Sequence, residues 1–207
     1  MPFLVFRCNQ CDFKGNDMVT WGPFSYLSGF KFIPLERQLG WCPDCAKFVP
    51  VEILPTSESL ISGAAQVESL RNAVEARRKY EIPNRSWFKG LFKHTEMSHE
   101  FIMLKCDLHV CKQTLKQAKA RAAALSGRSA KPKCLECGSI NAYALTMTMQ
   151  AAGDERNPAP AIPSGVLHPG CGGEFQVAHS DFWVNCVLPH RIYDTQGRFL
   201  RSEKQKR

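Results

Sequence analysis

Long hydrophobic runs and the motifs of common enzyme families are both missing from this sequence. No apolar stretch approaches the roughly 20 residues that span a bilayer. The apolar run at residues 1–7 is too short for a signal peptide and lacks a basic start. There is no Gly-rich phosphate loop, no GxSxG, no HExxH and no convincing carboxylate pair. We therefore expect an intracellular, cytoplasmic protein with no membrane span and no enzymatic activity.

Cysteine, in contrast, is abundant. The chain of 207 residues contains 10 cysteines, and its hydrophobic and charged fractions of 44% and 22% are those of an ordinary globular protein. Its length suits one or two small domains. Because disulfides are rare in a reducing compartment, this many cysteines favour metal binding.

Most of the cysteines fall into two sets with the same spacing. In each set a C-x2-C pair is followed, after thirty residues, by a second pair, which is C-x2-C in one set and H-x2-C in the other. Four ligands from two tight turns suit tetrahedral zinc and leave no open position for water, so we expect two structural zinc ions. The expected ligands are Cys8, Cys11, Cys42 and Cys45 in the first site, and Cys134, Cys137, His168 and Cys171 in the second.

The stretches CNQC, CPDC, CLECGS and HPGCGG resemble the zinc ribbon, the knuckle-and-hairpin fold of many transcription, replication and ribosomal proteins. The resemblance covers residues 1–55 and about 128–200, and it implies a small β ribbon in each. WCPDC also resembles rubredoxin, which holds iron in four thiolates, so iron stays an alternative at the first site. The usual glycines are absent there, because Asp12 follows Cys11 and Ala46 follows Cys45.

Strand-like segments flank the cysteine pairs, as ribbons require. A stretch without periodicity at 153–165 is expected to be an exposed loop of the second ribbon. The expected strands are 47–54, 142–149, 174–178 and 182–188, followed by a turn into a last strand within 193–200.

Helical periodicity replaces the strand pattern between the ribbons. Thr56 and Ser57 are plausible N-caps of a first helix, which Pro83 ends, and a second helix is expected over about 95–126, with Gly127 as its C-terminal cap. We expect the two to pack as an antiparallel hairpin. The apolar stripe of the first helix is Leu60, Gly63, Val67, Leu70 and Val74. The second helix carries a heptad seam typical of a coiled coil, namely Phe101, Leu104, Leu108, Cys111, Leu115, Ala118, Ala122 and Leu125.

These patterns predict an α+β fold of two small β zinc ribbons separated by a long antiparallel helical hairpin. The expected domains are 1–55 and 128–200 for the ribbons, 56–127 for the hairpin, and a basic tail at 201–207. Cys106 and Cys111 point about 140° apart on a helix, so a third metal site with His99 and His109 is disfavoured. Cys186 is interpreted as a core thiol.

Positive charge is concentrated in the second half of the chain. The net charge is +8, and residues 56–127 carry twelve basic and seven acidic side chains. Basic stripes suit phosphate contacts, and basic residues interleaved with aromatics can stack bases. The expected contacts are Lys112, Lys116, Lys119, Arg121, Arg128, Lys131 and Lys133, together with Arg85, Trp87 and Lys89 in the helical connection.

The favoured function is that of an accessory protein that binds DNA or RNA through backbone charge, within a larger complex. Nothing in the sequence resembles a recognition helix that reads base edges. One alternative is a protein–protein adaptor that docks through the hairpin, and another is a rubredoxin-like redox or metal-handling protein. An ordinary solvated helix face would explain the basic stripe equally well.

Overall fold

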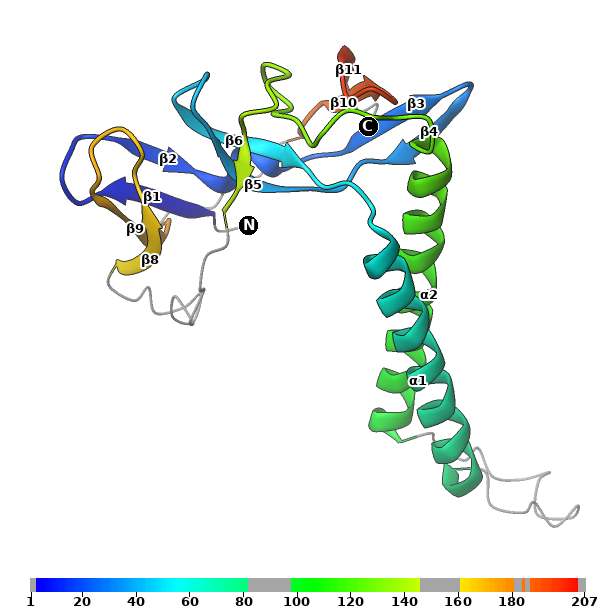
Figure 1. The fold of residues 1–207 in the computed structure, drawn as a ribbon. Coiled ribbons are helices and arrows are strands. Elements are labelled where there is room, and N and C mark those ends of the chain that lie inside the picture. Colours follow the sequence, from blue (N-terminus) through cyan, green and yellow to red (C-terminus); the bar gives the residue numbers. More distant parts are fainter. Residues whose placement is uncertain (1–2, 82–97, 146–160, 181–183, 185–186, 205–207) are drawn as a thin grey trace, which may run out of the picture. The chain divides into compact units, whose positions relative to one another are not determined.

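The computed structural model describes residues 3–81, 98–145, 161–180, 184 and 187–204 of the chain. It is an α+β protein with two long helices and several small sheets (Figure 1). The chain forms two compact units. Unit 1 combines Met1–Leu54 with Ala124–Arg207, and unit 2 is Pro55–Ala123.

The first sheet of unit 1 joins the two ends of the chain. Strand β1 pairs antiparallel with β2 on one side and with β9 on the other, and β9 continues to β8. The register places Cys8 opposite Phe175. The strands are β1 (Leu4–Cys8), β2 (Lys14–Asn16), β8 (Ile162–Leu167) and β9 (Glu174–His179), and a 3-10 helix, η1 (Asp17–Thr20), follows β2.

The other two sheets also combine both halves of unit 1. In the second sheet the order is β11-β10-β3-β4, and β10 runs parallel to β3. In the third sheet β5 lies between β6 and β7. The strands are β3 (Phe24–Ser28), β4 (Lys31–Pro34), β5 (Arg37–Cys42), β6 (Lys47–Glu52), β7 (Tyr143–Ala144), β10 (His190–Asp194) and β11 (Phe199–Glu203).

The expectation of two separate ribbons, 1–55 and 128–200, is therefore corrected. Each of the three sheets contains strands from both segments, and the two segments belong to one unit. Alternating patterns indicate that a segment forms a strand, but they do not specify which strand it pairs with. Pairing between neighbours in sequence accounts for β1–β2, β3–β4 and β5–β6, but not for the pairing of β1 with β9, β3 with β10 and β5 with β7.

Strand predictions also differ in detail. The expected strand 47–54 corresponds to β6 and 174–178 to β9, whereas five strands before residue 43 are not predicted. Only Tyr143–Ala144 of 142–149 forms a strand among its described residues. The expected loop 153–165 overlaps β8 at its end, and its residues 153–160 lie outside the described part. Of 182–188, Val184, Val187 and Leu188 are described and are not in a strand.

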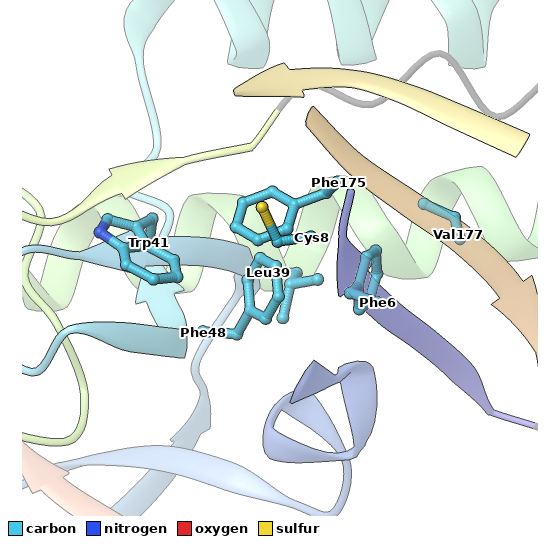
Figure 2. Packing of buried hydrophobic residues seen from close by; sticks show 7 residues of the cluster. All are labelled: Phe6, Cys8, Leu39, Trp41, Phe48, Phe175 and Val177. Atoms are coloured by element: carbon cyan, nitrogen blue, oxygen red, sulfur yellow. The ribbon is translucent and has the colours of Figure 1, made fainter. Parts of the chain in front are cut away.

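An aromatic core holds the first and third sheets together (Figure 2). Seven buried side chains converge from β1, β5, β6 and β9, with Phe6 fully buried and Phe175 1% exposed. The Phe48 ring pairs with those of Phe6 and Phe175, and the ring centroids are 4.8 Å apart in both pairs. Burial stabilises by roughly 1.5–3 kcal/mol for each large apolar side chain.

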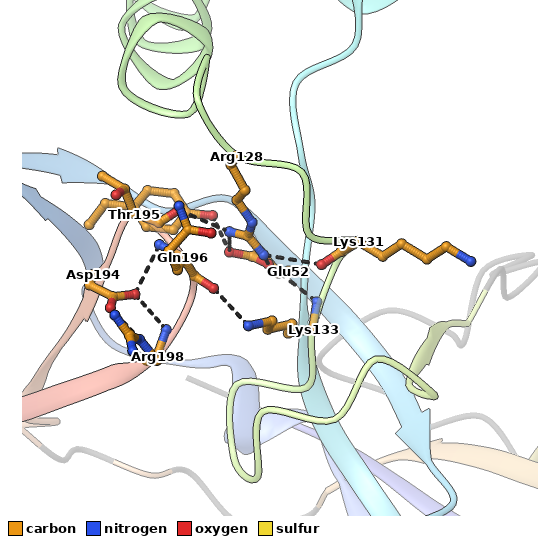
Figure 3. Close-up of polar contacts among 9 residues, drawn as sticks. Glu52, Arg128, Lys131, Lys133, Asp194, Thr195, Gln196 and Arg198 are labelled. Carbon is orange, nitrogen blue, oxygen red and sulfur yellow. Dashed lines mark hydrogen bonds and ion pairs between the residues drawn. The ribbon is translucent and has the colours of Figure 1, made fainter.

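A buried ion pair lies where the chain leaves unit 1 and returns to it (Figure 3). The Arg128 guanidinium donates to both oxygens of Glu52, at 2.6 and 2.5 Å, and the two side chains are only 1% and 0% exposed. The Tyr26 hydroxyl donates to the same carboxylate. Gly197, at φ +75°, leaves no room for a side chain, because a Cβ there would lie 3.1 Å from Glu52 Oε1. Arg128 is therefore part of the core rather than of the surface.

Unit 2 consists of α1 (Ser57–Glu81) and α2 (His99–Ala124). Thr56 caps α1, since its hydroxyl accepts from the Ser59 amide at 3.1 Å. The Ser98 hydroxyl caps α2, since it accepts from the Phe101 amide at 3.3 Å, and residues 95–97 of the expected second helix lie outside the described part.

Two contacts give the helices an antiparallel register. A Cβ built on Gly63 would lie 3.4 Å from Leu115 Cδ1, and Arg77 pairs with Glu100 at 2.7 Å. Every predicted stripe and seam position is buried or half-buried. The antiparallel packing is thus confirmed, whereas coiled-coil geometry stays a prediction. No helix in the described ranges is long and apolar enough to cross a membrane.

Candidate metal centres

The eight predicted ligands gather into two groups of four, and within each group the ligand atoms lie within 4.8 Å of one another. We call Cys8, Cys11, His168 and Cys171 the mixed cluster, and Cys42, Cys45, Cys134 and Cys137 the four-cysteine cluster. Within the described residues these are the two groups that could hold a metal ion.

The predicted pairing of the ligands is wrong. The first C-x2-C pair meets the H-x2-C pair, and the second C-x2-C pair meets the third, so that one cluster is nested inside the other. Both arrangements contain one four-thiolate site and one with an imidazole, and the two-residue gap within each ligand pair is the same in both. That gap could not separate them, and the equal separations of thirty residues favoured the wrong arrangement. The pairing of β1 with β9 decides between them, because it brings the two ends of the chain together.

Strand pairing builds the mixed cluster. Cys8 ends β1 and Cys11 follows in the next turn, while His168 and Cys171 lie in the turn between β8 and β9. The Asn9 amide donates to the Glu174 carbonyl at 3.0 Å, which continues the β1–β9 pairing to the turn. The Cys8 and Cys171 sulfurs are 3.4 Å apart, and His168 Nδ1 lies 3.2 Å from Cys171 Sγ and 3.3 Å from Cys11 Sγ. Nδ1 is thus the nitrogen that faces the thiols.

Aromatic rings fix the orientation of His168. The rings of Phe13, Trp41 and Phe175 lie 4.9, 5.1 and 5.1 Å from the imidazole, which is 8% exposed. Gly173 lets the opposing turn approach, since a Cβ there would lie 2.7 Å from Cys8 Sγ. The surrounding rings and the close approach at Gly173 therefore hold the imidazole in place.

The four-cysteine cluster is built on the third sheet. Cys42 ends β5, Cys45 lies in the turn before β6, and Cys134 forms a bridge to Val51 of β6. The sulfurs of Cys42 and Cys137 are 3.7 Å apart, and those of Cys45 and Cys134 are 3.9 Å apart. Cys42 and Cys134 are fully buried. This cluster therefore lies deeper in unit 1 at two of its four positions.

The distances suit a tetrahedral ion. A zinc–sulfur bond of about 2.3 Å gives sulfurs about 3.8 Å apart at the corners of a tetrahedron. The observed sulfur–sulfur distances of 3.4, 3.7 and 3.9 Å lie around that value. Both clusters can thus hold a metal ion without a large rearrangement.

The same backbone conformation follows three of the four ligand pairs. The residue directly after the second cysteine has a positive φ at Gly138, Gly172 and Ala46, with values of +78°, +76° and +49°. Glycine adopts this conformation freely, whereas alanine is strained in it. Gly138 and Gly172 therefore adopt this turn without strain, and Ala46 adopts the same turn without a glycine.

The pKa values of Cys134 and Cys8 shift in opposite directions. Burial raises the pKa of Cys134 to about 11, against amide hydrogen bonds from Cys137 and Glu136 that lower it. At Cys8 burial also disfavours the thiolate, but hydrogen bonds from the Gln10 amide and the Cys171 thiol lower the pKa to about 6. A bound cation favours the thiolate at both positions, so affinity for a metal is expected to rise with pH.

The residues predicted to contact nucleic acid differ in their exposure. Lys112, Lys116, Lys119 and Lys131 are exposed, whereas Arg121 is buried. Arg128 is sequestered by Glu52, and the half-buried Lys133 donates to the Gln196 carbonyl at 2.9 Å. The burial of Arg121 and the ion pair of Arg128 argue against phosphate contacts at these two positions, and contacts at the exposed lysines stay a prediction. Arg85, Trp87 and Lys89 lie outside the described residues, as does Cys186.

Two supporting features are not apparent from the sequence pattern. The aromatic rings around His168 come from three separate segments. Glu52 is one acid among many until its partner Arg128 is known. Comparison with family models, curated proteins and solved structures finds no match to this chain. The argument for function therefore rests on the geometry of the clusters and on the exposed surface.

Proposed function

We propose that this chain is a non-enzymatic protein that holds two structural zinc ions and binds nucleic acid through backbone charge. The observation that carries the zinc assignment is the pair of clusters, each with four thiolate or imidazole ligands at tetrahedral spacing. Four protein ligands leave no coordination position for water or substrate. A structural ion fits this arrangement better than a catalytic one.

Metal analysis of the purified chain tests this assignment. We expect two zinc ions for each chain, and loss of the unit 1 fold when a strong chelator removes them, because structural zinc contributes directly to folding. Iron in the four-cysteine cluster would support the rubredoxin-like alternative and would colour the protein. Retention of the unit 1 fold without metal would contradict a structural role.

The proposal of nucleic-acid binding rests on the surface of α2. Lys105, Lys112, Lys116 and Lys119 are exposed, and at 100° for each residue they lie within an arc of about 60°. At 1.5 Å for each residue the row extends over about 21 Å, which is long enough to contact several phosphates. No acidic residue occurs between Lys112 and Lys119. Such a row suits a phosphate backbone and carries no information about base sequence.

A charge reversal tests the lysine row. Replacing Lys112, Lys116 and Lys119 by Glu should weaken binding of DNA and RNA and reduce its dependence on salt. The matched control reverses Arg71, Arg78 and Lys79, three exposed basic residues of α1, with the same change in net charge. Equal losses in the two variants would show that overall charge, rather than the row, governs binding.

A protein partner is the second candidate, and exposed apolar residues on α2 favour it. Ile102, Cys106 and Val110 follow one another at helical spacing and line a cavity of about 400 Å³ with Lys105 and His109. Ile102 and Val110 are 42% and 60% exposed. An amphipathic helix of a partner suits such a face. Binding that survives high salt and is lost in Val110→Glu would favour this adaptor function over the nucleic-acid one.

A further inference from the structure

A second cavity lies on unit 1, whereas the lysine row belongs to unit 2. It has a volume of about 200 Å³, and the residues that line it include Leu135, Glu136, Arg191, Tyr193 and Phe199. That volume corresponds to about seven waters at roughly 30 Å³ each. The cavity is thus too small for a dinucleotide and has room for one planar ring system.

The wall of the cavity combines an aromatic ring with a positioned guanidinium. Phe199 is 54% exposed and meets the Tyr193 ring edge-on, with centroids 5.6 Å apart. Arg191 lies over the Phe24 ring at 5.1 Å and donates to Glu136 Oε1 at 3.0 Å. These contacts hold Arg191 in place while its side chain stays 30% exposed. Aromatic rings and guanidinium planes are the groups on which unpaired bases stack.

The charge around the cavity narrows the choice of ligand. Two basic side chains, Lys47 and Arg191, lie 3.8 and 3.0 Å from the single carboxylate of Glu136. This surplus of positive charge disfavours a cationic ligand. The polar groups of Glu136 and Arg191 disfavour a purely aliphatic one. A planar group with polar edges that is attached to an anion satisfies both conditions.

Strand β11 provides a path for that anion. β11 is the outer strand of its sheet in the described residues, and four of its five residues are exposed. Arg198 and Arg201 flank Phe199 and Leu200, with side chains 75% and 52% exposed. Each arginine is more than half exposed in its ion pair, with Asp194 or Glu203, so a phosphate can compete for the guanidinium. Basic residues beside a stacking platform are the usual arrangement for single strands.

We infer that this cavity binds one base of a single-stranded nucleic acid whose backbone runs along β11. The inference rests on the proposed nucleic-acid function and adds to it a preference for unpaired strands. Because bases in a duplex are stacked on one another, a duplex cannot fill the cavity without opening. The lysine row of α2 carries no such preference, since phosphates are common to both forms.

The test compares a short labelled single strand with a duplex of the same length by fluorescence anisotropy. Phe199→Leu keeps the apolar bulk but removes the aromatic face. Its affinity for the single strand should fall by about 5- to 150-fold, which corresponds to about 1–3 kcal/mol for one stacked base. Binding of the duplex should not change, and Phe199→Tyr should bind as the wild type does. Phe30→Ala is the control, because Phe30 is fully exposed at the β3–β4 turn, outside the residues that line the cavity.

The outcomes separate the two proposals. A selective loss for the single strand in Phe199→Leu, with none in Phe30→Ala, supports the cavity. If the wild type binds nucleic acid and Phe199→Leu binds the single strand equally well, the cavity inference fails and the proposed function stands. If the wild type binds neither form at low salt, both fail. Thermal unfolding of each variant confirms that its fold is intact.

Discussion

The mixed cluster is surrounded by aromatic rings, whereas the four-cysteine cluster is surrounded by aliphatic side chains and lies beside a buried ion pair. Phe13, Trp41 and Phe175 contact the imidazole of His168. Val49 and Val51 pack around Cys42 and Cys134. The Glu52 amide donates to the Lys133 carbonyl at 3.0 Å, next to Cys134, and the Lys133 amide donates back to the Glu52 carboxylate.

The two clusters are thus built from the same kind of ligand pair, with two residues between the ligands, in different surroundings. The mixed cluster joins the two ends of unit 1, while the four-cysteine cluster joins the segments between which unit 2 is inserted. An ion in either place would close a long loop of the chain and so reduce the entropy of the unfolded state. The two sites thus have separate structural tasks, although their sequence motifs are nearly the same.

The largest expected effect comes from two double variants, which test which ligand pairs bind the same ion. Cys11→Ser with Cys171→Ser affects only the mixed cluster, so we expect one zinc ion to remain. Cys11→Ser with Cys45→Ser affects both clusters and should leave none. Each lost ion removes apparent binding energy of about 10–16 kcal/mol. If the ligand pairs met in their order along the chain, the first double variant would hold no zinc ion and the second would hold one. Zinc release measured with a colorimetric chelator distinguishes the two results.

The sequence identifies the ligands, but it does not show which ligand pairs come together in one cluster. C-x2-C and H-x2-C spacing together identify every cluster residue, because two ligands in one tight turn have a local signature. Which turns meet depends on β1 pairing with β9, and that contact spans most of the chain. The helical stripes, from Leu60 to Val74 and from Phe101 to Leu125, could be predicted because their periodicity is local. Arg128 could not be assigned to the core, because nothing near it in sequence marks Glu52 as its partner.

The second prediction concerns the ion pair beside the four-cysteine cluster. Arg128→Met leaves Glu52 buried without its charge partner, which should destabilise unit 1 by about 3–5 kcal/mol. Adding Glu52→Leu should recover much of that loss, because no unpaired charge then remains. Chemical denaturation of the zinc-loaded single and double variants provides the measurement. If the double variant is no more stable than Arg128→Met alone, the cost arises from lost packing rather than from the unpaired carboxylate.

The third prediction concerns the aromatic surroundings of the mixed cluster. Phe13 is half-buried and its ring contacts four others, those of Trp41, Phe48, His168 and Phe175. Phe13→Ala should destabilise unit 1 by about 2 kcal/mol, below the range for a fully buried Phe. It should also speed the release of the ion from the mixed cluster, because His168 loses one side of its support. Zinc release from the four-cysteine cluster, followed in the same experiment, is the internal control. Equal acceleration at both clusters would contradict a local role for Phe13.

The smallest expected effect comes from the residue that follows each ligand pair in its turn. Ala46 occupies a left-handed conformation at φ +49°, where the corresponding residues of two other turns are Gly138 and Gly172. Relief of strain in Ala46→Gly is worth roughly 1–2 kcal/mol, and the greater freedom of glycine in the unfolded chain offsets about 0.4–1 kcal/mol of it. Because Ala46 is exposed, no packing is lost, and a net gain of at most about 1.6 kcal/mol should raise the midpoint of thermal unfolding by about 6 °C at most. Asp12→Gly is the matched control, since Asp12 follows Cys11 at the same position but does not have a positive φ. It should be neutral or destabilising, so a gain of equal size in Asp12→Gly would show that strain at Ala46 is not the cause.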